Sequence, residues 1–472
     1  MTDKTATFTE LYMSRYLLAG LAMLASASGL GAQQRATPVQ PTVIRNATVL
    51  TVTQGTLEST DVLLENGRIA RIGRNVQAPS GARIVDGTGK YLLPGIIDAH
   101  SHAMSDAINE GSLSVTSMTR IQDVLNPTAG NLYRILAGGV TTLHILHGSA
   151  NSIGGQNAVV KLKFGRSLDE MMFPGAMPGI KFALGENPKR ASRAPQRGET
   201  ARYPATRMGV EAVIRDAFTR ARDYKRDWDE YRAAVARRDA RAVPPRRDLE
   251  LEPLVEIIEG KRWVHAHSYR SDEILMLLQL ADEFGFRIRT LQHVLEGFKV
   301  ASEIAAHGAM ASTFADNWSY KIEAYDAIPH NAAVMTSHGV VVSLNSDSDE
   351  RARRMNIEAA KMVKYGGLSD DEALKLVTYN PALQLGIQDR VGSIEVGKDA
   401  DVVLWSQHPL SVYAVAEMTF IDGEVFFDRS QEATRLARLE QERRELEQAE
   451  PNRGPAPAAA RGAGSNRQGG SR

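Results

Sequence analysis

The sequence contains no cysteine among its 472 residues. Disulfide bonds and thiolate metal sites are therefore excluded, and any metal must be held by histidine, by a carboxylate or by a modified lysine. The 56 basic residues balance the 56 acidic ones. A formal net charge of zero argues against a general nucleic-acid binder. The length leaves room for one barrel-sized domain and a smaller one.

Long apolar runs are also scarce, and the one that suggests targeting lies near the N-terminus. Arg15 precedes the apolar stretch Tyr16–Leu24, and small residues follow it. This order is typical of a secretory signal peptide, predicted over residues 1–32 with Met13 as a candidate for the true start. The stretch is short for a membrane span, so we expect export to a bacterial periplasm or medium and no stable span after cleavage. An uncleaved anchor or a buried helix is the alternative.

Apolar periodicity divides the rest of the chain into parts. Short strands separated by turns such as Asn66-Gly67 fill residues 42–93, and similar strands return in residues 392–428. Between them, apolar strands alternate with helical stretches, which is typical of βα units and a parallel sheet. We therefore predict an α/β fold, a (β/α)8 TIM barrel over residues 94–391, flanked by a small β-sandwich built from both terminal segments.

Eight barrel strands can be assigned from these patterns. A charged insertion, residues 185–253, separates the fourth strand from the fifth and contains a helix predicted over Gly209–Arg241. Residues 429–472 are predicted to form a helix rich in Arg and Glu, followed by a disordered tail. The predicted strands are Leu92–Ala99, Thr141–Leu146, Ala158–Phe164, Ile180–Leu184, Trp263–Ala266, Arg287–Gln292, Ala309–Phe314 and Val340–Leu344.

Residues of metal-binding type lie where the predicted barrel strands end. The first strand runs into His100 and His102, whose side chains share a face because residues two apart on a strand point the same way. Converging imidazoles are the donors that zinc-type metals prefer. The ends of parallel barrel strands meet on one face, which is where we expect a metal centre. Later strands contribute further candidates: Lys181, His265, His267, His293 and Asp347.

Two segments resemble a known superfamily. Pro94-Gly95-Ile96-Ile97-Asp98-Ala99-His100-Ser101-His102 is similar to the first-strand signature of the amidohydrolase superfamily, and Gly392–Trp405 resembles that superfamily's closing β-segment. The resemblance spans about residues 42–428 and favours the imidazolonepropionase-like and Xaa-Pro-dipeptidase-like branch. It implies a barrel hydrolase with one or two divalent metal ions, zinc being the expected metal, and a metal-bound hydroxide as the nucleophile.

The resemblance also implies roles for individual residues. Lys181 matches a fourth-strand lysine that is carboxylated by carbon dioxide and bridges two metals, with Glu186, Lys161 or Lys163 as alternatives. His267 shares a face with His265 and can exchange roles with it, and Asp349 is a rival of Asp347. The implied metal ligands are His100, His102, Lys181, His265, His293 and Asp347.

The expected chemistry assigns a second role to Asp347 and names four candidates for substrate binding. Asp347 is expected to take a proton from water and pass it to the leaving nitrogen, as general base and then general acid. Arg270 follows the fifth strand and could bind a carboxylate with two hydrogen bonds, a surface salt bridge being the alternative. The other candidates are His267 on the fifth strand and two polar residues after the second, His147 and Gln156.

We therefore predict an exported amidohydrolase that cleaves a C–N bond in a small amide, cyclic amide or dipeptide-like substrate, with no nucleic-acid partner. One alternative is a one-metal deaminase or imidazolone-type ring hydrolase, in which Lys181 binds no metal. The other is a scaffold that kept the barrel and lost catalysis. The sequence leaves open whether the chain forms a homo-oligomer.

Overall fold

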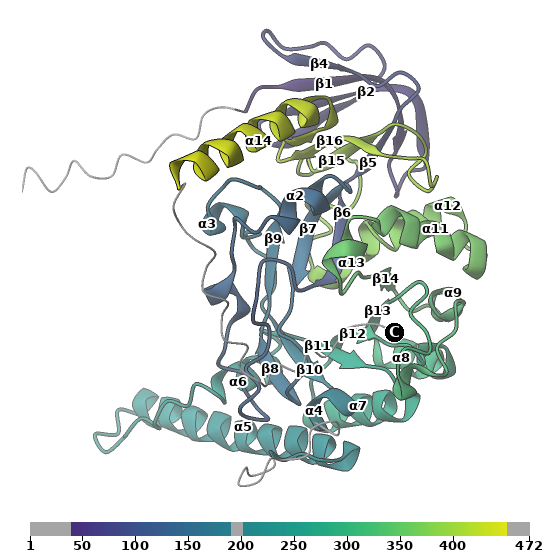
Figure 1. Ribbon diagram of the computed structural model, residues 1–472. Coiled ribbons are helices and arrows are strands. Elements are labelled where there is room, and N and C mark those ends of the chain that lie inside the picture. Colours follow the sequence, from purple (N-terminus) through teal and green to yellow (C-terminus); the bar gives the residue numbers. More distant parts are fainter. Residues whose placement is uncertain (1–38, 190–201, 451–472) are drawn as a thin grey trace, which may run out of the picture. The chain divides into compact units, whose positions relative to one another are not determined.

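Strands and helices alternate through the middle of the chain, between two groups of short strands near its ends (Figure 1). The computed structural model describes residues 39–189 and 202–450. All of these except Val39 belong to one compact unit, Gln40–Arg472. The predicted signal peptide, part of the insertion (190–201) and the predicted disordered tail from residue 451 lie outside the described residues.

An eight-stranded sheet contains strands from both ends of the described chain. Strand β15 is antiparallel to β5, with Leu404 opposite Leu92, and this pairing joins the two groups (Figure 1). Apolar residues from both groups, including Ile44 and Phe420, share one buried cluster. The strands are β1 (Thr42–Leu50), β2 (Thr56–Glu65), β3 (Arg68–Gly73), β4 (Arg83–Asp86), β5 (Tyr91–Pro94), β15 (Val402–Trp405), β16 (Ala416–Ile421) and β17 (Glu424–Asp428).

Hydrogen bonding therefore defines one sheet here, and the predicted two-sheet sandwich is not confirmed. The terminal segments do come together as expected, because β15 pairs with the edge of β5. The predicted first barrel strand is in fact split at Gly95. Its first half, β5, belongs to this sheet, and its second half, β6 (Ile96–Ser101), belongs to the barrel region.

The remaining predicted barrel strands are present, with shifted ends. Strands β10 to β14 form consecutive parallel pairs, and β6 is parallel to β7. This is the pairing expected of a TIM-barrel-like α/β fold. The strands are β7 (Val140–Ile145), β9 (Ala158–Lys161), β10 (Gly179–Ala183), β11 (Trp263–Ser268), β12 (Ile288–His293), β13 (Met310–Thr313) and β14 (Val342–Leu344).

The prediction of a closed barrel of eight parallel strands is not confirmed. Strand β9 is antiparallel to β7, and the additional strand β8 (Ile153–Gln156) is antiparallel to β10. Within the described residues, no strand ladder joins β9 to β10 or β14 to β6. The segment between β7 and β9 contains β8 and no helix. A parallel connection usually needs a dozen or more residues that form a helix, so the chain folds back instead.

Side-chain and backbone hydrogen bonds connect β6 and β14 where no ladder does. The carboxylate of Asp98 accepts hydrogen bonds from the backbone N–H of Ser346, at 3.0 Å, and from the Ser346 hydroxyl. The backbone N–H of Asp347 donates to the carbonyl of His100 at 3.1 Å. The C-terminal ends of the first and last barrel strands are therefore fixed to one another.

Helices pack around the central strands through apolar faces. In α7, Ile274, Leu277, Leu278 and Ala281 are buried at the spacing of one helix face, and the helix ends at Gly285, whose φ is 76°. The helices are α2 (Asn131–Leu136), α3 (Leu168–Met171), α4 (Glu186–Lys189), α5 (Arg207–Ala236), α6 (Glu252–Ile258), α7 (Ser271–Phe284), α8 (Ala301–His307), α9 (Asn331–Ser337), α10 (Asp349–Ala352), α11 (Met355–Gly366), α12 (Asp370–Lys375), α13 (Tyr379–Leu385) and α14 (Glu432–Ala449).

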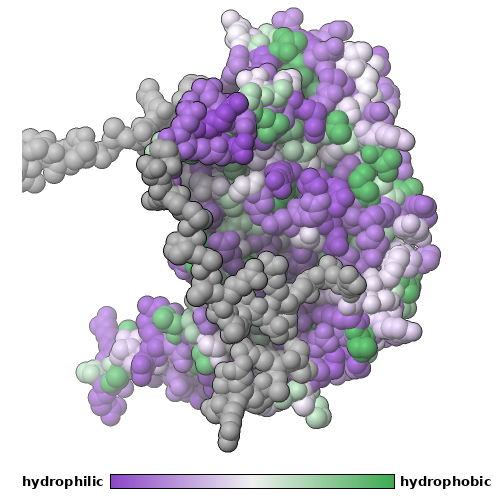
Figure 2. Space-filling model, viewed as in Figure 1, coloured by the Kyte–Doolittle hydropathy of each residue, from purple (hydrophilic) through white to green (hydrophobic). Residues whose placement is uncertain are grey.

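The two long charged helices are largely hydrophilic where they are visible in Figure 2, with some hydrophobic residues along α5. Helix α5 is the predicted insertion helix, and its buried residues lie between Gly209 and Ala221, in its first half. Its second half makes further contacts through Tyr224, which packs against the core, and through Lys225, which pairs with Glu259. Helix α14 has no buried residue. No helix in the described ranges combines the length and apolar character needed to cross a membrane.

Candidate metal centre

Four ligand-type side chains meet beside the C-terminal ends of β6, β12 and β14. Ligand atoms of His100, His293 and Asp347 lie within 4.8 Å of one another. The Asp347 carboxylate is 3.7 Å from Nε2 of His100 and 3.9 Å from Nε2 of His293. Nε2 of His102 lies 3.2 Å from the same carboxylate. Ligands arranged tetrahedrally around one zinc-sized ion are about 3.4 Å apart, so this spacing suits a shared cation.

The fifth strand contributes His267 to this group in place of His265. The rings of His267 and His293 are 4.8 Å apart, whereas His265 packs against His144 at 4.5 Å. The expectation that His265 belongs to this group is therefore corrected, and the expectation that His267 binds substrate stays a prediction. The reason is position along the strand, because β11 continues to Ser268 and a two-residue step moves a side chain by about 6.6 Å.

Unpartnered nitrogens show that the site suits a metal. Both ring nitrogens of His267 and Nδ1 of His293 are buried, and no described group forms a hydrogen bond with them. A buried polar atom without a partner costs about 1–3 kcal/mol. Coordination of a divalent ion would remove part of that cost, and imidazole nitrogens beside a carboxylate are donors that zinc-type ions accept. The residues present therefore fit a divalent metal.

Two hydrogen bonds orient the histidines of β6. Nδ1 of His100 lies 3.1 Å from Oε1 of Gln292, and Nδ1 of His102 lies 3.0 Å from the carbonyl oxygen of Leu146. Both partners are acceptors, so each Nδ1 carries the hydrogen and each Nε2 keeps a lone pair for a metal. Sequence reasoning missed Gln292. The one signal for Gln292 in the sequence is that it directly precedes His293. A polar residue beside a strand-end histidine is too common to identify it.

Lys181 lies in the same centre. Its side chain is fully buried, and its Nζ is 3.1 Å from Nε2 of His100. No described carboxylate forms an ion pair with it, and burial lowers the pKa of its amine to about 7. The alternatives for the bridging position lie elsewhere, since Glu186 is paired with a lysine and both Lys161 and Lys163 are paired with aspartates.

Two of the converging residues have an unusual backbone. His293 has a φ of 69° and Asp347 a φ of 44°, in the left-handed region that residues other than glycine seldom adopt. Such conformations cost about 1–3 kcal/mol and concentrate at functional sites. Burial raises the pKa of Asp347, but hydrogen bonding from His102 and the nearby cationic groups lower it overall to about 2. Its rival Asp349 is exposed and accepts a hydrogen bond from Asn131.

The predicted substrate-binding residues occupy other positions. Arg270 forms a two-fold ion pair with Asp272, at 3.0 and 2.8 Å, so the prediction that it is a carboxylate ligand is corrected in favour of a surface salt bridge. His147 is buried and uses its two ring nitrogens to hold the backbone of Glu110 and Gly148. It therefore positions loops.

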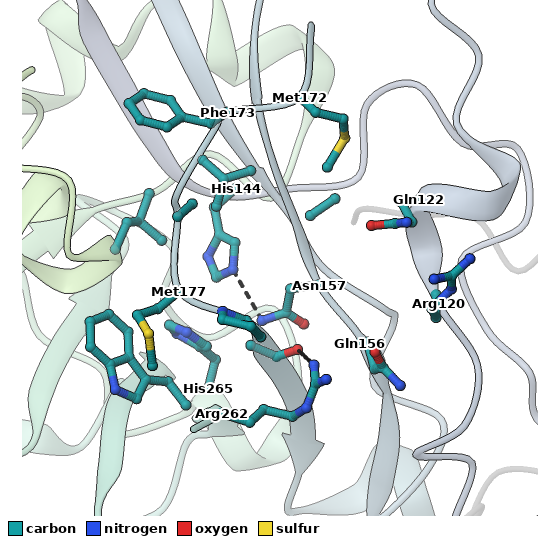
Figure 3. A pocket seen from close by; sticks show the side chains of 17 residues that line it. Arg120, Gln122, His144, Gln156, Asn157, Met172, Phe173, Met177, Arg262 and His265 are labelled. Carbon is teal, nitrogen blue, oxygen red and sulfur yellow. Dashed lines mark hydrogen bonds between the residues drawn. The ribbon is translucent and has the colours of Figure 1, made fainter. Parts of the chain in front are cut away.

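Gln156 lies at a different cavity, of about 240 Å³ (Figure 3). The residues that line it include Gly179 and Trp263, the first residues of β10 and β11, so the cavity lies at the N-terminal ends of these two strands. His144 and Asn157 are 3.0 Å apart there, and His265 lies beside them (Figure 3). The prediction that Gln156 contacts substrate at the metal centre is therefore corrected.

An aromatic wall, formed by Tyr269, Phe314 and Tyr320, borders the centre. The ring of Phe314 stacks on His293 at 4.9 Å, and Tyr269 lies 4.6 Å from His267. The hydroxyl groups of Tyr320 and Tyr269 are 2.6 Å apart. The aromatic wall makes one side of the centre apolar. The hydroxyl groups of Tyr269 and Tyr320 are the polar atoms of the wall.

Known proteins match this chain over most of the described region. The model of the Amidohydrolase family matches residues 91–426. Amidohydrolase tasK of Hapsidospora irregularis is 33% identical over 432 residues, which are 82% of this chain and 43% of that protein. The chain therefore spans less than half the length of that relative. A crystal structure of an amidohydrolase from Thermotoga maritima MSB8 is 35% identical with a TM-score of 0.74, covering 82% of this chain and 100% of that one.

A more distant relative agrees with the predicted branch. Imidazolonepropionase of Mesorhizobium japonicum is 24% identical over 407 residues, 77% of this chain and 91% of that protein. Strand-end histidines, the joined terminal sheet and the family match over residues 91–426 all agree. The chain belongs to the amidohydrolase family, whose members are hydrolases acting on carbon–nitrogen bonds.

Proposed function

We propose that this chain is a metal-dependent hydrolase that cleaves an amide-type C–N bond in a small amide, cyclic amide or dipeptide-like substrate. The observation that supports it most is the convergence of His100, His293 and Asp347 within 4.8 Å, beside the unpartnered ring of His267. A scaffold that had lost catalysis would have no reason to keep these buried nitrogens without partners.

The metal ligands proposed from the structure are His100, His102, His267, His293 and Asp347, with Lys181 beside them. A divalent ion held there would activate a water molecule and polarise the scissile carbonyl. Zinc is the metal we expect, since imidazole and carboxylate donors suit it and the chain has no thiolate. Gln292 and the Leu146 carbonyl keep the lone pairs of the first two histidines directed at the centre.

Asp347 is the group we propose to move the proton. Its carboxylate lies among the three histidines and its low pKa keeps it ionised. It takes a proton from the attacking water and then gives that proton to the leaving nitrogen, so the amine leaves as a neutral group. The hydrogen bonds from Ser346 to Asp98 hold the segment that carries Asp347 against the end of β6.

We further propose that Lys181 is carboxylated. Its amine would attack carbon dioxide, form an N–C bond and lose a proton, leaving a carbamate anion beside His100. The geometry favours this reaction, because Lys181 is fully buried, lies at the centre and has no carboxylate partner among the described residues. An anionic carbamate would place a second negative ligand between two cations. The one-metal deaminase or ring hydrolase is the alternative, with Lys181 unmodified.

Metal analysis and an activity screen test these proposals together. Purified protein reconstituted with Zn²⁺ and bicarbonate is expected to hold two metal ions per chain and to hydrolyse a member of a panel of N-acyl amino acids, dipeptides and lactams. One ion per chain, with no bicarbonate dependence, would favour the one-metal alternative. Protein that binds metal and hydrolyses nothing on a broad amide panel would contradict the proposed activity.

Asp347→Asn separates the chemical step from binding. We expect a loss of activity of about 100-fold or more, because the amide can neither accept nor return the proton. Metal content, measured by mass spectrometry of the purified protein, should fall much less. Asp349→Asn is the matched control, since Asp349 is exposed two residues further on, and its activity should be unchanged. An active Asp347→Asn variant would remove the proton-transfer role.

Export is also proposed, on the signal-like segment of residues 1–32. The test is the N-terminal sequence of protein recovered from a bacterial expression host. We expect the mature chain to begin after the small residues that follow Leu24 and to be found outside the cytoplasm. An intact N-terminus on cytoplasmic protein would contradict export.

A further inference from the structure

Arg351 is held at the edge of the metal centre. It lies in α10, four residues after Asp347, and is half-buried. Its Nη1 donates to the carbonyl of Ser346 at 3.1 Å, and its guanidinium carbon is 5.5 Å from the centre of the Phe314 ring. Because Phe314 stacks on His293, these two contacts hold the guanidinium beside the aromatic wall.

Neighbouring cations already have carboxylate partners. Arg353 and Arg354 both pair with Glu350, at 2.5 and 3.4 Å. Lys321, whose amine lies 4.3 Å from the centre of the Tyr269 ring, pairs with Glu323 at 2.9 Å. No carboxylate in the described ranges forms an ion pair with Arg351. A partly buried guanidinium is best satisfied by an anion that accepts two of its N–H groups, and none of the residues in 39–189 and 202–450 supplies one.

We propose that Arg351 binds a carboxylate of the substrate that lies next to the leaving nitrogen. This inference rests on the proposed hydrolase function. The same short segment carries Asp347, which returns the proton to that nitrogen, and Arg351, so the group bound by Arg351 must lie close to the nitrogen in the substrate. An α-amino acid leaving group fits, because one carbon separates its nitrogen from its carboxylate.

The substrate class is therefore an N-acyl α-amino acid or a dipeptide with a free carboxylate. Simple amides and lactams without a carboxylate would lack the partner that Arg351 requires. Arg351 replaces Arg270 in the role that the sequence suggested, since Arg270 is occupied by Asp272. The cation lies at the end of the eighth strand and not the fifth, on the same side as the proton donor.

Binding to an inactive protein tests this assignment without relying on turnover. The Asp347→Asn protein, loaded with Zn²⁺, is titrated calorimetrically with N-acetyl-L-alanine, N-acetyl-L-leucine and N-acetyl-L-proline. Each acid is compared with the alcohol in which a hydroxymethyl group replaces the carboxylate. We expect at least one acid to bind about 10- to 100-fold more tightly than its alcohol, the value typical of a charge-assisted hydrogen-bonded pair.

Two substitutions in the same background decide whether Arg351 is responsible. Arg351→Met should abolish the preference for the acid and leave the affinity for the alcohol unchanged. Arg353→Met, the matched control on the same helix, should preserve the preference. A preference that survives Arg351→Met, or no acid that binds better than its alcohol, overturns the proposal. Failure of the active protein to hydrolyse any amide would instead overturn the proposed function.

Discussion

Two buried lysines, on strands that follow one another in the chain, have opposite surroundings. Lys161 on β9 is almost fully buried, and its amine forms ion pairs with Asp399, Asp401 and Asp422 at 2.7, 3.1 and 2.5 Å. Lys181 on β10 is equally buried and has no such partner. Burial lowers the pKa of Lys161, but the three aspartates raise it overall. Burial lowers the pKa of Lys181 to about 7, and the nearby charge of Asp347 only partly opposes this.

The difference separates a structural lysine from a chemical one. Lys161 links β9 to Asp399 and Asp401, which precede β15, and to Asp422 in the turn between β16 and β17. It therefore ties the barrel region to the terminal sheet. The amine of Lys181 lies beside His100 without a counter-ion among the described residues, which suits the carboxylation proposed above. Lys161 and Lys181 are the same residue type and are equally buried. They differ in the number of carboxylate counter-ions around the amine.

The largest effect is expected from Lys161→Met. Removal of the cation leaves three carboxylates close together, two of them buried, so the free energy of unfolding should fall by about 3–5 kcal/mol. Urea denaturation measures the loss. Lys163→Met is the matched control, because its amine is partly exposed and pairs with Asp422 alone, and it should lose much less. Equal losses from the two substitutions would remove the structural role of Lys161.

Lys181→Met should show the reverse pattern. We expect activity to fall about 100-fold or more and metal content to fall from two ions toward one, because the proposed bridging ligand is gone. The unfolding temperature of the metal-free protein should stay equal or rise, since an unpaired buried amine is replaced by a thioether. Unchanged metal content would contradict the bridging role, and a loss of stability as large as that of Lys161→Met would break the comparison.

His265 and His267, the two histidines of β11, allow a second comparison, between a histidine beside the metal centre and one away from it. His267→Ala should lower metal affinity about 10- to 100-fold, measured by competition with a chelator, because His267 lies beside His293. His265→Ala is the control two residues away, and it should leave metal affinity nearly unchanged while it enlarges the cavity shown in Figure 3. The opposite order would return the ligand role to His265.

Glu273 is the intermediate case, a buried carboxylate with one counter-ion. Burial raises its pKa to about 7, although Arg207, 2.6 Å away, acts to lower it. The folded pKa lies above the unfolded value of about 4.3, so the stabilisation is complete below that value and is lost as the pH rises through 7. The loss should be no more than about 1.4 kcal/mol per pH unit.

Glu273→Gln should flatten this pH dependence between about pH 4 and 7, measured by urea denaturation at each pH. Glu303→Gln, on the exposed side of α8, is the control and should leave the profile as it is. A Glu273→Gln profile parallel to the wild-type profile would show that one arginine already compensates the buried charge.

The sequence predicts which types of ligand residue lie at the strand ends, but not the position along each strand at which a ligand reaches the metal centre. His100, His293 and Asp347 follow apolar strands, and the structure brings them together. His265 and His267 share a face on β11, so alternation alone could not choose between them. The choice depends on where β11 ends relative to β12, where His293 pairs with Ser268. Strand register of this kind is a tertiary property.

Other features depended on partners far away in the chain. Arg270 and Arg351 both follow barrel strands, and only the structure shows that the first is occupied by Asp272 and the second is not. The sequence predicts β9 as a parallel third strand, whereas β9 is antiparallel to β7, because an apolar run does not show in which direction a strand will pair. Gln292 and Asp98 support the centre through contacts that no local pattern encodes.

The pairing of β5 with β15 has a consequence for how this chain can be divided. A fragment that stops before Val402 would expose the unsatisfied backbone of β5 and the apolar side of Leu92. Open strand edges of this kind associate with other chains. Since β5 continues through Gly95 into the strand that carries His100, such a fragment would also lose the fixed start of its first histidine strand. Neither the fragment that ends before Val402 nor the remaining C-terminal fragment is therefore expected to be recovered as a folded, soluble protein by itself.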